Sequence, residues 1–279
     1  MKIEDFILYS EKYRHFNGKV LVLSTMYRSG AAALCQILHC AGERDNRLTA
    51  YATPDVFSVL AIYAEDFFVM GLEKLRQVLL ASIRYFCKDQ SLDQTIVLKL
   101  RSNCSRLVPH FHAVAPNIMH IYMARDKLED SLHFYMNTPK NYSEILKLIV
   151  IIRDTHPYLC DWLTTLCQQE NYMINLVKPN NILELALALT GRSPIDYKKN
   201  RRYYAMPVIY YETLVTEMIS TVNSIFDACG LPNMNIPDVL ECKKSLELKS
   251  CDNEFEPFTT EEKITIDRIT QLIGVYSEY

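Results

Sequence analysis

The sequence predicts an α/β domain in which a parallel sheet is covered by helices on both faces. Short apolar segments with the length of buried strands alternate along the chain with longer segments of helical periodicity. The chain has 279 residues, of which 49% are hydrophobic and 23% charged, a composition typical of a globular protein with a sizeable core. We expect one domain over residues 1–279, with helix-rich insertions between the strands.

The first strand is expected at residues 19–24, because nearly all of them are apolar, as in a strand buried on both faces. A helix should follow over residues 31–41, where Leu34, Ile37, Leu38 and Ala41 recur at helical spacing. The next helical stretch is expected to start at Thr53-Pro54-Asp55, with Thr53 as N-cap and Pro54 at the first helical position. It should reach about Met70, and another helix should occupy about 72–88.

Two more strands are expected at residues 95–100 and 117–124, each followed by a helix, near 104–115 and over 126–136. Residues 142–168 read as helical with a break near His156-Pro157, and residues 180–191 as a helix that ends at Gly191. A fourth strand at 206–211 precedes a helix over 214–229 that Gly230 closes. The last helix, about 259–273, should be capped by Thr259 or Thr260 with Glu262 three or two residues later.

Several classes of protein are disfavoured by composition. A formal net charge of −3 argues against a nucleic-acid-binding protein, and the nine cysteines form no C-x-x-C pair that would indicate a zinc ribbon. Cys35 and His39 share a helix face without further ligands nearby, so no metal is expected. The N-terminus lacks the apolar core of a signal peptide and no apolar run is long enough to span a membrane. We expect a cytoplasmic protein that contacts neither membrane nor nucleic acid.

A short turn, Tyr27-Arg28-Ser29-Gly30, lies between the first strand and the first helix. An anion is favoured there, because amides at a helix start are unpaired and the helix dipole is positive. The alternative is that Gly30 only eases an ordinary connection. Further cations follow two other strands, Lys99 with Arg101 and then Arg125. Because ligands of parallel sheets bind at the carboxyl ends of strands, this arrangement favours the anion.

Four blocks in order resemble the sulfotransferases that use 3′-phosphoadenosine 5′-phosphosulfate (PAPS). The turn resembles their 5′-phosphosulfate loop, whereas the G-x-x-x-x-G-K-[ST] pattern of nucleotide triphosphatases is absent. Residues 97–136 are similar to their block of lysine strand, helix, P-N-x-x-x-I and a strand that ends in Arg-Asp. Residues 208–232 match a strand followed by Tyr-Glu-x-Leu, and residues 259–276 resemble the closing helix. The resemblance implies a P-loop-like three-layer fold.

The resemblance also implies a set of residues that bind the donor PAPS, whose product is adenosine 3′,5′-bisphosphate. The 5′-phosphate and sulfonate would lie on the loop and the start of the helix, which are Tyr27, Arg28, Ser29, Gly30, Ala31 and Ala32. Arg125 would bind the 3′-phosphate, with Ser131 or His133 as the second contact. Arg201 and Arg202 would belong to a lid over the nucleotide, although they also read as an exposed basic loop. Each arginine has an alternative as a solvated or ion-paired residue.

The sequence departs from the family at three points. Hydroxyl residues usually follow the glycine, where this chain has Ala31-Ala32-Ala33, and the serine expected eight residues after Arg125 is His133, with Ser131 six residues on. The catalytic histidine of the cytosolic branch is replaced by Arg101, which cannot accept a proton. The candidate proton acceptors are therefore Glu43, Asp45, Asp55 and His133, although each of the three acids also reads as a solvated loop residue. Lys99 would either neutralise the transferring group or simply pair on the surface.

The resemblance therefore implies an enzyme that moves a sulfonate from PAPS to a hydroxyl or nitrogen of a small-molecule acceptor. It extends to bacterial sulfotransferases of specialised metabolism, whose acceptors include saxitoxin-type guanidinium alkaloids. The alternative is a non-catalytic relative that binds the nucleotide and acts as an interaction module, which the alanine-rich loop and the missing histidine favour. The oligomeric state is left open.

Overall fold

A computed structural model describes residues 1–14, 18–42, 47–64, 70–137, 140–160, 171–231, 239–242 and 256–275. Its centre is a five-stranded sheet with the order β2-β3-β1-β4-β5, in which every neighbouring pair is parallel. The strands are β1 (Lys19–Thr25), β2 (Leu48–Ala52), β3 (Thr95–Lys99), β4 (Met119–Ala124) and β5 (Ile209–Tyr210). The predicted α/β class is confirmed, and β2 is a strand that the sequence analysis missed.

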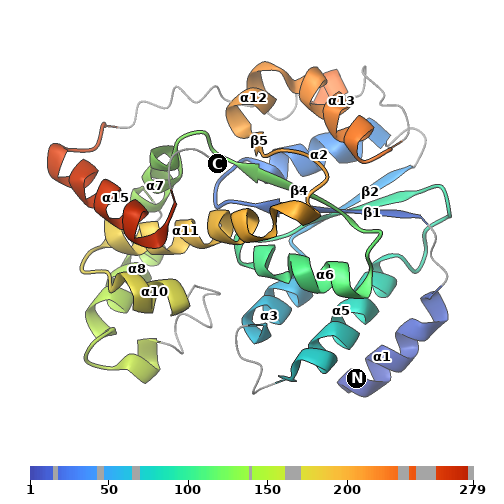
Figure 1. Cartoon of the computed structure of the whole chain (residues 1–279), viewed down its shortest axis with the longest axis horizontal. Helices are drawn as coiled ribbons and strands as arrows, with labels where there is room; N and C mark the ends of the chain where they lie inside the picture. Colours follow the sequence, from blue (N-terminus) through green and yellow to red (C-terminus); the bar gives the residue numbers. More distant parts are fainter. Residues whose placement is uncertain are drawn as a thin grey trace.

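Helices cover both faces of this sheet and make the fold three-layered (Figure 1). One face is covered by α2 (Ala31–Gly42), α12 (Tyr211–Thr216) and α13 (Met218–Ala228). The other carries α1 (Ile3–Ser10), α3 (Asp55–Tyr63), α5 (Leu72–Phe86) and α6 (Val108–Val114). Strand residues alternate between the two layers: Val20 and Val22 pack toward α3 and α5, whereas Leu21 and Leu23 pack toward α2.

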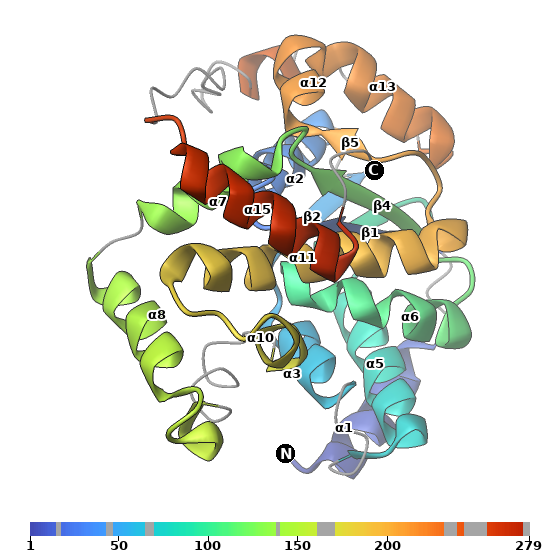
Figure 2. The ribbon, with the colours of Figure 1, turned by 60° about the vertical axis from the view of Figure 1, so that its left-hand side comes forward.

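A helical group extends from one end of the sheet (Figure 2). It contains α7 (Leu128–Met136), α8 (Lys140–Ile152), α10 (Asn171–Val177), α11 (Ile182–Asn200) and α15 (Thr260–Ile273), which share one hydrophobic core. The predicted break near His156-Pro157 is confirmed, because α8 ends at Ile152 and residues 157–160 are helical again. The last helix has the predicted cap: Thr259 and Glu262 form a capping box.

Three helix predictions differ from the structure in their boundaries. The helix at 180–191 does not end at Gly191 but continues to Asn200. Gly191 serves close packing, since a Cβ there would lie 2.3 Å from Cδ1 of Ile273 on α15. Thr53 does not cap α3, since Pro54 is the N-cap residue and Asp55 the first helical one; the Thr53 amide instead donates to the carbonyl of Lys99 (2.8 Å) and extends the β2–β3 pairing. The helix predicted over 214–229 is divided at Glu217 into α12 and α13.

The topology brings the predicted cationic positions to one edge. Because β1 lies between β3 and β4, the turn after β1, Lys99 at the end of β3 and Arg125 after β4 follow three neighbouring parallel strands. The carboxyl edge of a parallel sheet at such a reversal of strand order is where ligands bind. No helix among the described residues has the length and apolarity needed to cross a membrane.

Candidate functional site

The turn after β1, residues 26–30, forms a tight loop with two left-handed residues. Arg28 has a φ of 56° and Gly30 a φ of 75°. A side chain at position 30 would be strained by this φ, and its Cβ would lie 2.1 Å from Cδ2 of Tyr211, so only glycine fits. Arg28 adopts a backbone conformation that non-glycine residues rarely do, and such strain concentrates at binding sites. We refer to residues 26–30 as the anion loop.

The start of α2 presents unpaired donors at this loop. The carbonyl of Gly30 accepts the amides of Ala33 (2.9 Å) and Leu34 (3.2 Å), so Gly30 begins the helical hydrogen-bond pattern. The amides of Ala31 and Ala32 have no acceptor within the described part of the chain. The Ser29 hydroxyl is buried and likewise finds no hydrogen-bond partner among the described residues. These donors and the helix dipole fit an oxyanion such as phosphate or sulfonate.

Arg125, which follows β4, and residues of α7 and α12 clamp the anion loop. Arg125 is buried; its Nε donates to the Arg28 carbonyl (3.0 Å), and its Nη1 pairs with Glu212 Oε1 (3.1 Å). The Tyr211 ring packs on Gly30, and the Arg125 guanidinium lies 4.2 Å from the centre of that ring. Ser131 Oγ donates to the Tyr27 carbonyl (3.0 Å). The loop is thus held from several sides.

These contacts place the predicted residues for the 3′-phosphate. Arg125 and Ser131 lie beside the loop, and both already contact its backbone; the 3′-phosphate role of each stays a prediction. His133 stacks on Phe258 with ring centres 4.1 Å apart, and burial lowers the pKa of its imidazole. Its predicted roles as phosphate contact or base are likewise untested.

Lys99 occupies a partly buried position at the end of the neighbouring strand. By strand alternation its side chain faces the α2 layer, where Cys35 lies. Burial lowers the pKa of the Lys99 ammonium, and burial also raises the pKa of the Cys35 thiol to about 11. The lysine thus has a poorly solvated cationic group at the edge where the anion loop lies. A perturbed lysine of this kind is typical of functional sites.

The same edge holds a second strained residue and a cavity that the sequence analysis did not anticipate. Thr53, directly after β2, has a φ of 53°, an outlier for a β-branched residue. Beside it is a cavity of about 390 Å³ with a largely aromatic and apolar lining, made by Phe6, Tyr51, Ala52, Pro54, Asp55, Val56, Ser82, Tyr85 and Phe86. At its rim, Asp55 pairs with Arg101 (Oδ1 to Nη2, 3.1 Å).

The structure does not bring all predicted site residues together. Arg201 and Arg202 belong to the 3₁₀ turn Arg201–Tyr203, and the adjacent Tyr204 pairs with His120 near the start of β4. The anion loop lies beyond the other end of β4, about 13 Å of strand away. Glu43 and Asp45 lie outside the described residues. Among the described candidate bases, Asp55 lines the aromatic cavity.

The residues that the sequence analysis missed are those of the clamp. Tyr211 and Glu212 were noted only as part of a Tyr-Glu-x-Leu block, and nothing in their local sequence indicates contact with a loop some 180 residues earlier. Among the described residues, His, Cys, Asp and Glu side chains form no group suited to a metal ion.

The comparisons with known proteins gave structural neighbours only. No family model matches the chain, and no curated protein matches its sequence. A sulfotransferase domain from the curacin biosynthetic pathway is 13% identical, with 93% of this chain and 98% of that chain covered and a TM-score of 0.48. Mouse sulfotransferase SULT7A1 complexed with PAP is 9% identical over 96% of this chain and 89% of its own, with a TM-score of 0.45.

A third structure, sulfotransferase STF9 from Mycobacterium avium, is 11% identical, covers 98% of this chain and 79% of its own, and has a TM-score of 0.45. Likenesses at these identities and TM-scores leave the family of the chain unassigned.

Proposed function

We propose that this protein is a sulfotransferase that takes its sulfonate from PAPS and passes it to a small molecule. The observation that carries the proposal is the anion loop, where two helix-start amides and a buried hydroxyl lie unpaired within the described chain beside a partly buried lysine. The loop continues from the central strand, as in the sulfotransferase block that residues 19–38 resemble. These groups fit an anion without the lysine of a nucleotide triphosphatase loop.

The chain's own residues divide the work of such a transfer. Arg28 and the amides of Ala31 and Ala32 would hold the phosphosulfate, with the Ser29 hydroxyl as a further donor. Lys99 would neutralise charge on the bridging oxygen as the bond to sulfur breaks. PAPS supplies the activated sulfonate, so the protein needs mainly to align donor and acceptor.

The aromatic cavity at the end of β2 supplies a place for the acceptor. Tyr51 and Ala52, which line it, belong to β2, and Ala52 pairs with Lys99 of β3; Pro54, Asp55 and Val56 follow the strand. Asp55 at its rim is the proton acceptor that we propose for the acceptor's hydroxyl or amine. Specialised metabolites, the saxitoxin-type alkaloids among them, form one class of acceptor to be tested.

Calorimetric titration with adenosine 3′,5′-bisphosphate tests the proposal. We expect wild-type protein to bind it, and Gly30→Ala to abolish binding, since Tyr211 leaves no room for a Cβ. Ser29→Ala should weaken binding about ten-fold or more, as for a lost hydrogen bond to a charged group. Ser220→Ala on α13 serves as control. A folded wild-type protein that binds neither the bisphosphate nor PAPS would overturn the proposal.

A further inference from the structure

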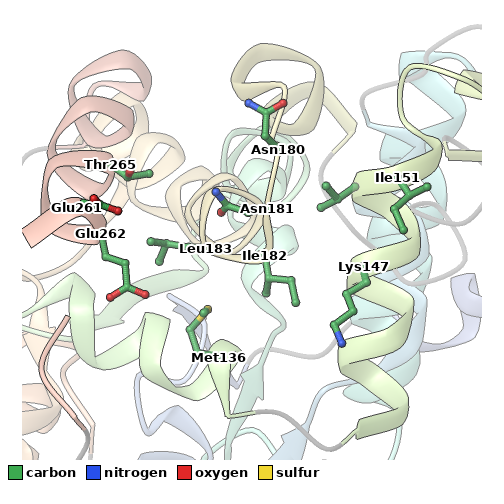
Figure 3. Close-up of a pocket in the computed structure, with 11 residues that line it drawn as sticks. Met136, Lys147, Ile151, Asn180, Asn181, Ile182, Leu183, Glu261, Glu262 and Thr265 are labelled. Atoms are coloured by element: carbon green, nitrogen blue, oxygen red, sulfur yellow. The ribbon is translucent and has the colours of Figure 1, made fainter. Parts of the chain in front are cut away.

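A second, larger pocket lies among the helices beyond the sheet. It has a volume of about 550 Å³, within the range of small-molecule sites (Figure 3). It is lined by Met136 of α7, Lys147, Val150 and Ile151 of α8, Asn180 to Leu183 at the start of α11, and Glu261, Glu262 and Thr265 of α15. None of these residues belongs to the anion loop or to the aromatic cavity at β2. The pocket is therefore a feature that the proposed function does not use.

One wall of this pocket is apolar and open to solvent. Ile151 is 69% exposed and Met136 39% exposed; Val150 and Ile182 are partly exposed, and Leu183, which also lines the pocket, is buried. Leu148 on α8, which does not line the pocket, is also exposed. Clustered exposed apolar side chains around a cavity indicate that something apolar covers them.

The opposite wall, on α15, is acidic (Figure 3). Glu262 is occupied by the capping box with Thr259, whose amide donates to Oε2 at 2.8 Å. Glu261 is exposed and makes no hydrogen bond or ion pair within the described chain. Lys147, across the pocket, is already paired with Glu144 (3.0 Å). The net charge at the mouth therefore favours a cation.

The two helix starts at this pocket do not offer an anion site. The Asn181 side chain accepts the amide of Glu184 (2.9 Å), and Glu184 Oε2 accepts the amide of Asn180 (2.7 Å). At α15 the Glu262 amide is bonded to Thr259 Oγ1 (3.3 Å). These first-turn donors are satisfied by side chains, in contrast to those of α2.

We infer that this pocket binds a small organic cation with an apolar body, of the alkylammonium type. The apolar part lies against Ile151, Val150 and Met136, and the ammonium lies at the Glu261 carboxylate. A neutral apolar ligand would desolvate that carboxylate without compensation, whereas a cation compensates it. Met136 lies on α7, the helix whose Ser131 contacts the anion loop. Binding of the alkylammonium ion does not require a bound nucleotide.

The test compares three probes of one chain length by ligand-observed NMR titration: octylamine, octanol and octanoate at pH 7 and low salt. We expect octylamine to bind more tightly than octanol by about three-fold, the effect of one exposed ion pair, and octanoate to bind most weakly. Ile151→Ser should weaken both octylamine and octanol several-fold, because each loses buried apolar contact. Leu148→Ser, an equally drastic change on the same helix outside the pocket, should leave both unchanged.

Glu261→Gln tests the contribution of the Glu261 charge to octylamine binding, because it removes the charge and keeps the size of the side chain. It should remove the preference for octylamine over octanol while octanol binding stays the same, and Asp267→Asn, an exposed carboxylate on α15 outside the pocket, should change neither. Adenosine 3′,5′-bisphosphate affinity should be unaffected by Glu261→Gln, so this proposal can fail while the proposed function stands. Equal affinity of wild type for octylamine and octanoate, or equal effects of Ile151→Ser and Leu148→Ser, would overturn it.

Discussion

Two roles fall to Arg125: it supports the anion loop, and by the resemblance it would bind the 3′-phosphate of the nucleotide. Its guanidinium lies in a nearly buried position, where it donates to the Arg28 carbonyl of the anion loop, pairs with the Glu212 carboxylate and lies against the Tyr211 ring. The resemblance assigns the same guanidinium to the 3′-phosphate of the nucleotide. A buried arginine that holds a strained loop contributes to affinity through geometry, whereas one that touches phosphate contributes directly, and the two can be distinguished.

Arg125→Ala and Glu212→Gln together make this distinction. If Arg125 binds the 3′-phosphate, Arg125→Ala should lower the preference for adenosine 3′,5′-bisphosphate over AMP about ten-fold or more. Glu212→Gln, which keeps the arginine and removes its carboxylate, should retain that preference. Calorimetry with both nucleotides measures it. Parallel losses of affinity for both nucleotides in both variants would show that Arg125 only supports the loop.

The buried His120 is expected to make the stability of the fold depend on pH. It is buried, neither ring nitrogen has a hydrogen-bond partner among the described residues, and burial lowers its pKa to about 3. Below pH 6.5, the unfolded chain takes up a proton that the folded chain does not, so this contribution to stability is present above that pH and is lost as the pH falls. We expect a loss of about 1.4 kcal/mol per pH unit below 6.5 from this group.

His120→Phe should remove this part of the acid sensitivity, since phenylalanine has the ring but no titrating group. Urea unfolding of both proteins at pH 7.5 and pH 5 measures it. The free energy of unfolding of the wild type should fall more than that of the variant. An equal fall in both would contradict the assignment of a neutral buried His120.

At the scale of elements, α15 is the clearest case of a helix whose end was predictable. The spacing of Thr259 and Glu262 predicts the capping box, and the structure confirms it with Thr259, not Thr260, as the cap. Thr259→Ala should lower the free energy of unfolding by about 1 kcal/mol, whereas Thr260→Ala, at the first helical position, should change it little. Urea unfolding of the two variants decides between them. Equal effects would show that the cap contributes nothing.

Helices and strands could be predicted where the local sequence pattern determines them. They were missed where contacts with residues distant in the sequence determine them. The strands β1, β3 and β4 and the turn after β1 could be predicted, because strands buried on both faces are continuous apolar runs in the local sequence. The segment Leu48–Ala52 carries a weaker apolar signal and is a strand because it pairs with β3. Gly191 reads locally as a helix end, but it accommodates Ile273 from the other end of the chain.

The same division holds for the site. The cations after β1, β3 and β4 could be placed from sequence, because parallel strands bring their carboxyl ends to one edge. The clamp by Tyr211 and Glu212, the strained Thr53 and the aromatic cavity depend on contacts between distant segments. They became visible only in the folded chain.

At the scale of the whole molecule, the central strand β1 leads into the anion loop, and the aromatic cavity lies at β2, two strands away in the sheet. An enzyme of this design should transfer a sulfonate, while a non-catalytic relative should bind the nucleotide without turnover. Asp55→Asn distinguishes catalysis from binding, because it keeps the shape of the rim and removes the proton acceptor.

The most direct measurement is therefore the release of adenosine 3′,5′-bisphosphate from PAPS by the purified protein in the presence of a panel of small hydroxyl- and amine-bearing acceptors. We predict acceptor-dependent release with at least one of them, lost in Gly30→Ala and reduced on the order of 10²-fold in Asp55→Asn with nucleotide binding retained. Tight nucleotide binding with no release across the panel would contradict the enzyme and favour the interaction module. Release that is unchanged in Gly30→Ala would contradict the role of the anion loop.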